Sequence, residues 1–296
     1  MENDQQFSAG EIRDAIRHIR DLLKTYINEN GIKALVIGIS GGIDSATCAA
    51  LARPVCDELG IPLIGRSLPT FLNKNCETDN ASVVGNAFCT DFKEVNIVHI
   101  TGLMMAFIEQ EESGSFGENC VPMEKNEKIR RGNVIARTRM IYLYNLAHLH
   151  GGMVLSTDNL TELLLSFFTI AGDIGDFGMI QGVFKTEVYT ISRYLVGEFT
   201  TNGENDKARA LDACIGCTVT DGLGVSNSSL EQLGAASYDD VDDILIRHVV
   251  MNDPSVLDHP IIVRHERYRF KRDNPHNIPR SKIFPGDTTF DDTKLL

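Results

Sequence analysis

The chain has 296 residues, of which 43% are hydrophobic and 23% are charged, and its formal net charge at pH 7 is −13. This length suffices for one large α/β domain with a substantial core, and the acidic balance argues against a broad surface for nucleic acid or membrane. No window has the apolar length of a membrane span, and the start MENDQQFSAGE lacks the pattern of a signal peptide, so we expect a cytoplasmic protein.

The first half of the chain predicts alternating strands and helices. Ser8-Ala9-Gly10-Glu11 has the pattern of a capping box, and apolar residues then recur every three or four positions until Gly31, which predicts an amphipathic helix. A buried strand is predicted over residues 35–39, a helix over 46–59 and a second parallel strand over 61–68. These segments form one βαβ unit.

The middle of the chain continues this alternation. We predict a helix over residues 78–88, a third strand over 95–100 and a helix over 103–112. Two glycines and a proline in residues 113–122 predict a loop, and a long helix over 129–148 leads to a fourth strand at 153–155.

Ser156-Thr157-Asp158-Asn159 is a good start for the next helix, and further helices are predicted over 186–196 and from about Val241. The prolines after Lys271 predict an irregular tail. With no repeat and no low-complexity linker, a single domain over residues 1–296 is the simplest organisation, with an irregular tail at 273–296.

The segment Ser40-Gly41-Gly42-Ile43-Asp44-Ser45 joins the first strand to the following helix. Adjacent glycines let backbone N–H groups converge on an anion, which the positive end of the helix and the two serine hydroxyls also stabilise. Asp44 beside bound phosphates is best explained as a ligand of a hard cation such as Mg²⁺. The segment lacks the lysine of the Walker A pattern. We therefore predict a phosphate-binding loop; the alternative is a Gly-Gly turn capped by Ser or Asp.

This segment resembles the pyrophosphate-binding loop of the ATP pyrophosphatases, which adenylate a substrate and release pyrophosphate. The group includes NAD, GMP, asparagine and argininosuccinate synthetases and the tRNA thiolation and lysidine enzymes. The resemblance implies an α/β fold with a Rossmann-like parallel sheet flanked by helices, similar to the adenine-nucleotide alpha-hydrolases. It also implies that all six residues of the loop contact ATP. The loop alone indicates the adenylation half of the reaction and does not identify the substrate that is adenylated.

Two later segments narrow the resemblance to NAD synthetases. Arg131-Gly132-Asn133-Val134-Ile135-Ala136-Arg137-Thr138-Arg139-Met140 is similar to their Gly-Asn-x-x-Ala-Arg-x-Arg-Met motif. Ser156-Thr157-Asp158-Asn159-Leu160-Thr161-Glu162 is similar to their Gly-Thr-x-x-x-x-Glu motif and follows a strand, at the edge where open α/β sheets bind ligands.

The resemblance implies that Thr157 contacts ATP and that Arg137 contacts deamido-NAD. It also implies that Glu162 completes a Mg²⁺ site with Asp44. Without the resemblance, Glu162 is explained equally well as a first-turn carboxylate favoured by the helix dipole.

The segment Phe167-Phe168-Thr169-Ile170-Ala171-Gly172-Asp173-Ile174-Gly175-Asp176-Phe177 resembles the family's aromatic-Thr-x-x-Gly-Asp stretch, and Lys185-Thr186-Glu187-Val188 resembles its Lys-Thr-x-Val. The resemblance implies that Asp176 binds deamido-NAD and that Lys185 reaches an ATP phosphate. A positioned cation there stabilises the charge that builds on the released pyrophosphate. On the sequence alone, Lys185 could also be an ordinary residue at a helix start.

The C-terminal third adds weaker matches. Thr218-Val219-Thr220-Asp221-Gly222-Leu223 resembles Pro-Thr-x-x-Leu, with Thr220 at the ATP-contacting threonine. Lys271 matches the lysine of the family's His-Lys-Arg, which lies close to the substrate. The matches run from about residue 8 to residue 272. Four positions depart from the family pattern, mainly on the dinucleotide side: Ser156, Ser166, Ile170 and Phe270.

The resemblance implies an ammonia-dependent NAD synthetase, a ligase that amidates deamido-NAD with ATP and Mg²⁺ through an acyl-adenylate and releases AMP and pyrophosphate. Asp44 and Lys185 are the implied catalytic residues. It also implies a homodimer. No room is left for a glutaminase domain, so we expect free ammonia or a separate glutaminase partner. Residues 113–122 and 200–223 are expected to contribute a lid, or to be surface loops.

Two alternatives remain at this point. A tRNA thiolation or amination enzyme would make Cys214 and Cys217 functional, since these two alone have metal or redox spacing among seven scattered cysteines. We treat the pair as structural, because a zinc site would need two further ligands at a matching spacing. The other alternative is a divergent member that binds nucleotide without turnover.

Overall fold

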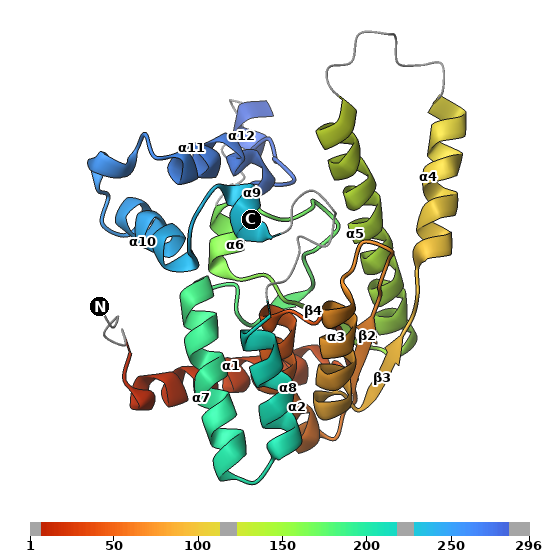
Figure 1. The fold of residues 1–296 in the computed structure, drawn as a ribbon, viewed down its shortest axis with the longest axis vertical. Coiled ribbons are helices and arrows are strands. Elements are labelled where there is room, and N and C mark those ends of the chain that lie inside the picture. The colour runs from red at the N-terminus through yellow and green to blue at the C-terminus, as the bar shows by residue number, and fades with distance from the viewer. Residues whose placement is uncertain (1–6, 113–122, 218–227, 284–296) are drawn as a thin grey trace.

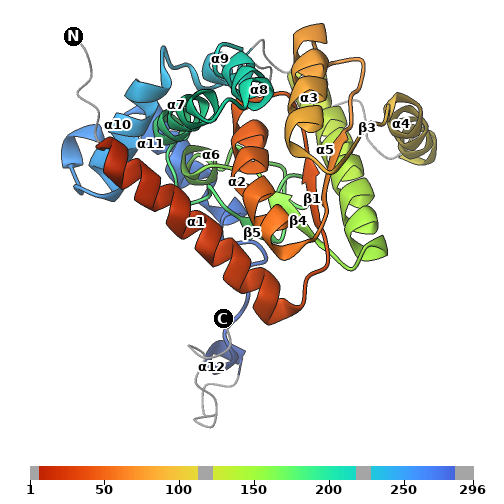
Figure 2. The ribbon, with the colours of Figure 1, turned by 90° about the horizontal axis from the view of Figure 1, so that it is seen from below.

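The computed structural model describes residues 7–112, 123–217 and 228–283. Its centre is a parallel sheet of five strands in the order β3-β2-β1-β4-β5, with helices on both faces (Figures 1 and 2). The predicted Rossmann-like parallel sheet flanked by helices is therefore confirmed. The strands are β1 Leu35–Gly38, β2 Leu63–Ser67, β3 Asp91–Glu94, β4 Met153–Ser156 and β5 Phe177–Gly178.

The described helices follow the strands in the alternation that a parallel sheet requires. In chain order they are α1 Ala9–Asn30, α2 Ile43–Leu59, α3 Asn75–Phe88, α4 Val98–Glu112, α5 Met123–Leu149, α6 Leu160–Leu164, α7 Lys185–Thr201, α8 Asn205–Ile215, α9 Ser229–Leu233, α10 Tyr238–Val249, α11 Pro260–Arg267 and α12 Arg280–Ile283, with short 3₁₀ turns η1 Pro254–Val256 and η2 Arg269–Lys271. None of these helices combines the length and the apolar content needed to cross a membrane.

The central strand β1 is apolar throughout because both of its faces are covered. Leu35 pairs with Leu63 of β2 and with Met153 of β4 in parallel register. Side chains alternate between the faces of a strand, so Leu35 and Ile37 enter the core formed with α1, α2, α3, α7 and α8. Val36 enters the opposite core, formed with α4 and α5. A strand buried on both faces needs the near-continuous apolar run seen here.

The first helix forms where its sequence predicts it. Ser8 accepts a hydrogen bond from the backbone N–H of Glu11, whose carboxylate accepts one from the backbone of Ser8 in return. Gly31 ends the helix with φ of +63°, a left-handed conformation that favours glycine. Between these caps, the isoleucines and leucines at helical spacing are buried against α2 and α7.

The third strand lies at a different place from the prediction. We predicted it at residues 95–100, but β3 is Asp91–Glu94 and residues 98–112 form α4. The sequence Asp-Phe-Lys-Glu of β3 is mostly polar because it is an edge strand with exposed residues. It is held by buried Arg66 of β2, which donates to the Asp91 carboxylate at 2.7 Å and to the Asp91 carbonyl at 3.2 Å. The apolar pattern that usually identifies a strand is therefore missing.

Two other predictions need correction. Part of the region predicted as a lid or surface loop, residues 200–223, is the helix α8, which packs on α7, α3 and α2. The chain after Lys271 is less irregular than predicted, because α12 lies within it. The other predicted lid, residues 113–122, lies outside the described residues. The short strand β5 was not predicted.

Adjacent leucines on α1 provide a test of this packing. Leu23 is fully buried, whereas 66% of Leu22 is exposed. Leu23→Ala should lower the free energy of unfolding by about 2–5 kcal/mol, because it removes buried methyl groups and leaves a cavity. Leu22→Ala should change it by less than about 0.5 kcal/mol. Urea unfolding followed by circular dichroism measures both; equal losses would contradict the assigned orientation of α1.

Candidate active site

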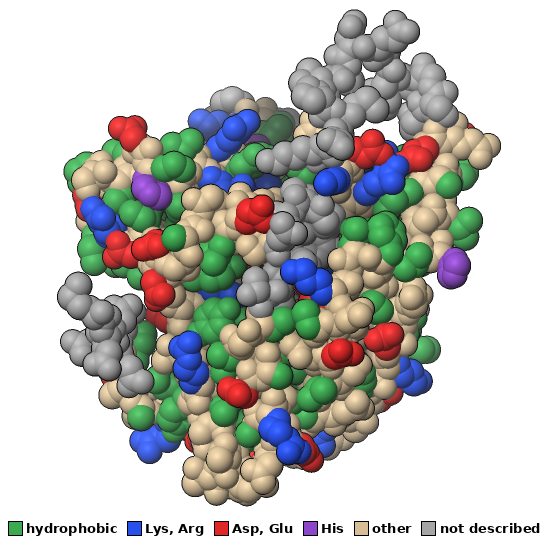
Figure 3. Space-filling view, viewed as in Figure 1, with side chains coloured by type: hydrophobic (Ala, Val, Ile, Leu, Met, Phe, Trp, Pro, Cys, Tyr) green, Lys and Arg blue, Asp and Glu red, His purple; other side chains and the backbone are tan. Residues whose placement is uncertain are grey.

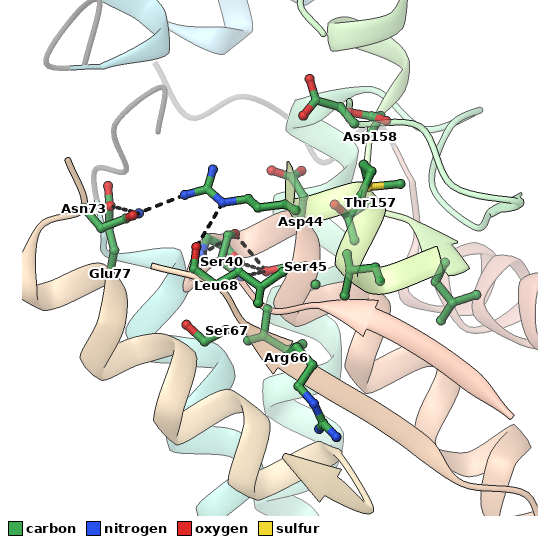
Figure 4. A pocket seen from close by; sticks show the side chains of 18 of the residues that line it. Ser40, Asp44, Ser45, Arg66, Ser67, Leu68, Asn73, Glu77, Thr157 and Asp158 are labelled. Atoms are coloured by element: carbon green, nitrogen blue, oxygen red, sulfur yellow. Dashed lines mark hydrogen bonds between the residues drawn. The ribbon is translucent and has the colours of Figure 1, made fainter. Parts of the chain in front are cut away.

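A pocket of about 290 Å³ opens at the carboxyl ends of β1, β2 and β4. Figure 4 shows Ser40, Asp44 and Ser45 on one of its walls, with Thr157 and Asp158 after β4 on another. The start of α3 and Arg139 from α5 also line it, as do Lys185 at the start of α7 and residues 167, 172 and 173 after α6. Because parallel strands point their carboxyl ends to one edge, segments that are far apart in the sequence meet here.

The loop at residues 40–45 has the geometry of an anion site. Gly41 has φ of +83°, and a side chain at this position would place its Cβ 2.0 Å from the backbone oxygen of Glu77 in α3. Only glycine fits. Gly42 is the N-cap of α2 and brings no side chain to cap the helix. The first-turn N–H groups of α2, which lack partners within the helix, are thus left for a ligand at the pocket wall.

The two serine hydroxyls of the loop bond to each other and to its backbone. Ser40 Oγ lies 3.1 Å from Ser45 Oγ and accepts a hydrogen bond from the N–H of Gly42 at 3.2 Å. Ser45 Oγ donates to the carbonyl of Gly42 at 3.1 Å and accepts from the N–H of Ser40 at 3.2 Å. These bonds hold the loop in its shape while both hydroxyls remain at the pocket (Figure 4).

Lys185 and Asp44 form an ion pair inside the pocket, although 141 positions separate them in the sequence. The Lys185 side chain is only 4% exposed. Burial alone would lower its pKa, but the carboxylates of Asp44 and Glu162 raise it above the usual value. The amide of Asn159 also donates to Asp44, at 3.0 Å. Lys185 therefore stays a cation.

The backbone of Lys185 is positioned by a short network behind the pocket. Its N–H donates to Thr161 Oγ1 at 2.9 Å, and Thr161 donates to the Asp242 carboxylate at 2.5 Å. The same carboxylate accepts from the N–H of Thr186 at 2.9 Å. One buried aspartate of α10 thereby joins the start of α7 to α6.

Carboxyl groups outnumber cations in this part of the pocket. Burial, followed by the charge of Asp44, raises the pKa of Glu162 to about 8. Burial, followed by the charge of Asp173, raises the pKa of Asp158 to about 7. Such crowding of oxygen donors is unfavourable without a counter-charge and is typical of sites for hard divalent cations. The residues present therefore fit Mg²⁺, with Asp44 and Glu162 among the available ligands.

Arg139 lines the pocket and was not among the predicted site residues, whereas Arg137, predicted to contact deamido-NAD, lies outside the lining. Arg139 donates to the carbonyl of Leu68 at 3.0 Å and to Asn73 Oδ1 at 3.3 Å. Arg137 is exposed and donates to the carbonyl of Ile170. Two residues apart on a helix point in nearly opposite directions. The spacing of apolar residues along α5 could have identified Arg139 as the arginine that points inward. Ile135 and Leu143, four positions to either side of it, are buried.

The remaining predicted residues are distributed between the pocket and its surroundings. Thr157 lines the pocket. Asp176 is exposed and accepts a hydrogen bond from the N–H of Val154 at 2.8 Å, outside the pocket lining. Lys271 donates to the carbonyls of Ser166, at 2.7 Å, and of Phe168. Thr220 lies outside the described residues. The roles assigned to these side chains stay predictions.

Asp158 and Asp173 line the pocket and were not among the predicted site residues. Asp173 accepts from the N–H of Thr169, and burial raises its pKa. Its position directly after Gly172, as in the Gly-Asp of the family motif, was the available signal. Asp158 follows Thr157 at the end of β4, where ligand-binding side chains gather in such sheets.

The thiols of Cys214 and Cys217 lie in different surroundings. Cys214 is buried in the core, whereas the sulfur of Cys217 lies 4.0 Å from that of Cys76 at the start of α3. Among the six described cysteines, Cys76 and Cys217 are the two that are not buried. The structural interpretation is consistent with the burial of Cys214.

The sheet order, the glycine-rich loop and the charged pocket define an α/β nucleotide-binding protein of the adenine-nucleotide alpha-hydrolase fold. The family model described as NAD synthase matches residues 15–256. The chain therefore belongs to the NAD synthase family.

Named relatives agree with this assignment. The chain is 32% identical over 187 residues to the NH(3)-dependent NAD(+) synthetase of Methanosarcina acetivorans, covering 62% of this chain and 68% of that protein. It is 35% identical over 211 residues to the enzyme of the same name from Pyrococcus horikoshii, covering 70% and 73%. In fold it is similar to the structure of NMN synthetase from Francisella tularensis, with a TM-score of 0.71, 24% identity and coverage of 90% and 97%.

The raised pKa of Glu162 predicts how stability depends on pH. A carboxyl group whose pKa is higher in the folded than in the unfolded chain holds its proton longer when folded, so stability falls as the pH rises from about 4.5 to about 8. Glu162→Gln removes this loss. Without nucleotide or divalent cation, it should raise the free energy of unfolding relative to wild type more at pH 8 than at pH 5.

Urea unfolding at the two pH values measures this difference. Glu111→Gln, on the exposed surface of α4, is the matched control and should give the same small difference at both. A Glu162→Gln effect that does not change with pH would contradict the assignment of a buried, proton-holding carboxyl.

Proposed function

We propose that this protein amidates deamido-NAD to NAD with ammonia, at the expense of ATP, which is converted to AMP and pyrophosphate. The observation that carries the proposal is the ion pair between buried Lys185 and half-buried Asp44, which lies in the pocket beside the glycine-rich loop. A fixed cation next to free helix N–H groups suits the triphosphate of ATP, and the family membership supplies the reaction class.

In the first step, the carboxylate of deamido-NAD attacks the α-phosphorus of ATP, and the bond from that phosphorus to the bridging oxygen breaks. The products are an acyl-adenylate and pyrophosphate. The N–H groups at residues 43–45, in the first turn of α2, and the Lys185 ammonium hold the pyrophosphate and stabilise the charge that it gains. Asp44 keeps the lysine aligned. Asp44 and Glu162 would hold Mg²⁺, which neutralises phosphate charge when bound.

In the second step, ammonia attacks the acyl carbon, the bond from that carbon to the phosphate oxygen breaks and AMP leaves, and the nitrogen loses one proton to solvent, giving the amide of NAD. The mixed anhydride is already reactive, so the protein's task is to position the reactants and to keep water away. Phe167, Leu68 and Met140 supply apolar lining to the pocket. The dinucleotide contacts proposed for Arg137, Asp176 and Lys271 are separate from this lining and belong to the acceptor side.

The experiment is a coupled measurement of AMP and NAD from ATP, Mg²⁺ and deamido-NAD, with ammonium or glutamine as the nitrogen donor. We expect NAD and AMP in equal amounts with ammonium and no product with glutamine unless a glutaminase is added. Nicotinic acid mononucleotide and tRNA are tested as other acceptors. AMP formation with one of these but not with deamido-NAD would overturn the proposed substrate, and no AMP with any acceptor would favour a non-catalytic nucleotide-binding protein.

Substitution of the ion pair tests the catalytic assignment. Asp44→Asn should lower kcat by about 100-fold or more, because it removes the partner of Lys185 and a proposed Mg²⁺ ligand. Asp57→Asn, at the exposed end of the same helix α2, is the control and should keep near wild-type turnover. Circular dichroism verifies folding. Near-normal activity of folded Asp44→Asn would exclude the proposed role.

We further propose that the protein is a homodimer and that the exposed face of α4 contributes to its interface. Figure 3 shows apolar side chains on the surface of this region. Four of them, Ile100, Leu103, Met104 and Phe107, recur at the spacing of one helix face and are 41–68% exposed. An apolar stripe of this kind is typical of an association surface.

Two leucines of nearly equal exposure test the interface. Leu103 on α4 is 68% exposed and Leu22 on α1 is 66% exposed. Leu103→Glu should raise the dimer dissociation constant by about tenfold or more, because it buries a charge in an apolar contact. Leu22→Glu should leave it unchanged. Sedimentation equilibrium measures both constants, and a wild-type protein that is monomeric at all accessible concentrations would refute the proposal.

We also propose that residues 1–296 form one domain and that the protein acts in the cytoplasm. The described cysteines are free thiols, which is consistent with a reducing compartment.

A further inference from the structure

A cluster of two histidines and a glutamate lies between α10 and α11, away from the pocket. His248 is in the last turn of α10, and His265 and Glu266 are in the last turn of α11. These two helices pack against each other and belong to the C-terminal helices on one side of the sheet (Figure 1). None of the three residues lines the active-site pocket.

We propose that these three side chains form a binding site for a divalent transition-metal ion of the Zn²⁺ class. Imidazole nitrogen and carboxylate oxygen are preferred Zn²⁺ ligands, and two histidines with one glutamate are a known three-ligand set. The proposal concerns an ion distinct from the Mg²⁺ of the reaction, and it does not depend on the proposed function.

The separations within the cluster match tetrahedral coordination. Ligand atoms bound to Zn²⁺ at 2.0–2.1 Å with tetrahedral angles lie about 3.3 Å apart. His248 Nε2 lies 3.4 Å from Glu266 Oε1, and His265 Nε2 lies 3.7 Å from the same oxygen. All three ligand atoms lie within 4.8 Å of one another. Side-chain movements of about an ångström suffice to close the site.

The hydrogen bonding of His265 favours the required tautomer. Its Nδ1 lies 2.7 Å from the carbonyl of Leu164, which can only accept a hydrogen bond, so Nδ1 carries the proton. Nε2 is then left with a lone pair that faces His248 and Glu266. Metal-binding histidines characteristically donate their second ring nitrogen to a carbonyl or carboxylate in this way.

Arg272 is the nearby charge that opposes a cation. Its Nη2 lies 3.4 Å from His265 Nε2 and must move aside when the site is loaded. Its Nη1 contacts the carbonyls of Leu164 and His265, at 2.7 and 3.0 Å, and Ser166 Oγ at 2.9 Å, and these contacts oppose the movement. We therefore expect micromolar affinity rather than the tighter binding of closed structural zinc sites.

The site would add a bound ion to parts of the structure that packing and hydrogen bonds now hold together. One ligand comes from α10 and two come from α11, and His265 also bonds to Leu164, the last residue of α6. The helix α6 carries Glu162 into the active-site pocket. A bound ion would thus tie α10, α11 and α6 together and stabilise the folded chain by its preferential binding to that state.

The test uses Zn²⁺ itself, with Mg²⁺ in excess to occupy the carboxylates of the active-site pocket and with two exposed thiols removed. Cys76 and Cys217 are two partly or fully exposed thiols 4.0 Å apart, so the parent protein carries Cys76→Ser and Cys217→Ser. After treatment with a chelator and its removal, calorimetric titration should give one Zn²⁺ per chain with a micromolar Kd, and Zn²⁺ should raise Tm. Co²⁺ in its place should give the visible absorption of a tetrahedral complex.

Two variants and one control decide between a built site and scattered surface binding. His248→Ala and Glu266→Gln should each weaken Zn²⁺ binding at least tenfold and abolish the rise in Tm, while their metal-free Tm values stay close to that of the parent. His18→Ala, at an exposed histidine of α1, should bind as the parent does. No binding by the parent, or equal binding by the parent and both cluster variants, would overturn the proposal.

Discussion

The active-site pocket depends on one ion pair, between buried Lys185 at the start of α7 and half-buried Asp44 in the first turn of α2. Burial makes an unpaired charge costly, so each group requires the other, and the two helix starts are held together. The network of Thr161 and Asp242 behind the lysine fixes it from the other side. The phosphate loop, which ends at α2, is positioned by the same constraint.

The charges around this pair differ from those of an ordinary structural salt bridge. Glu162 and Asp158 add carboxyl groups whose raised pKa values, about 8 and about 7, mean that protein groups do not fully compensate their charges. A structural network would be expected to satisfy its members. This pocket instead keeps carboxylate oxygens that a bound cation can use as ligands. Carboxyl groups with shifted pKa values that gather in a cleft are common at functional sites.

Local signals in the sequence sufficed for most of the fold. The capping box at Ser8, the apolar run of β1 and Ser237, whose hydroxyl accepts from the N–H of Asp240 at the start of α10, each act over a few residues. Such local signals can be recognised directly in the sequence. Strand β3 could not, because it is held by Arg66, which comes from another strand. Helix α8 was missed because its buried face is largely alanine and cysteine, residues that give a weak apolar signal.

The candidate site was predictable to a similar degree. Asp44, Lys185, Thr157 and Glu162 meet in one pocket, as the family motifs implied. Arg139 and Asp173 also line the pocket and were not predicted, since a motif fixes the order of residues but not the direction of each side chain. That direction depends on helix phase and on tertiary contacts.

The close approach of Gly41 to the carbonyl of Glu77 has a further consequence. Because no atom can be inserted between them, a displacement of the first turn of α3 must displace the phosphate loop, and the reverse also holds. The side chain of Asn73, just before α3, bonds to Arg139 on the opposite wall of the pocket. A shift of the phosphate loop toward α3 would therefore also move the part of the pocket wall that carries Asn73.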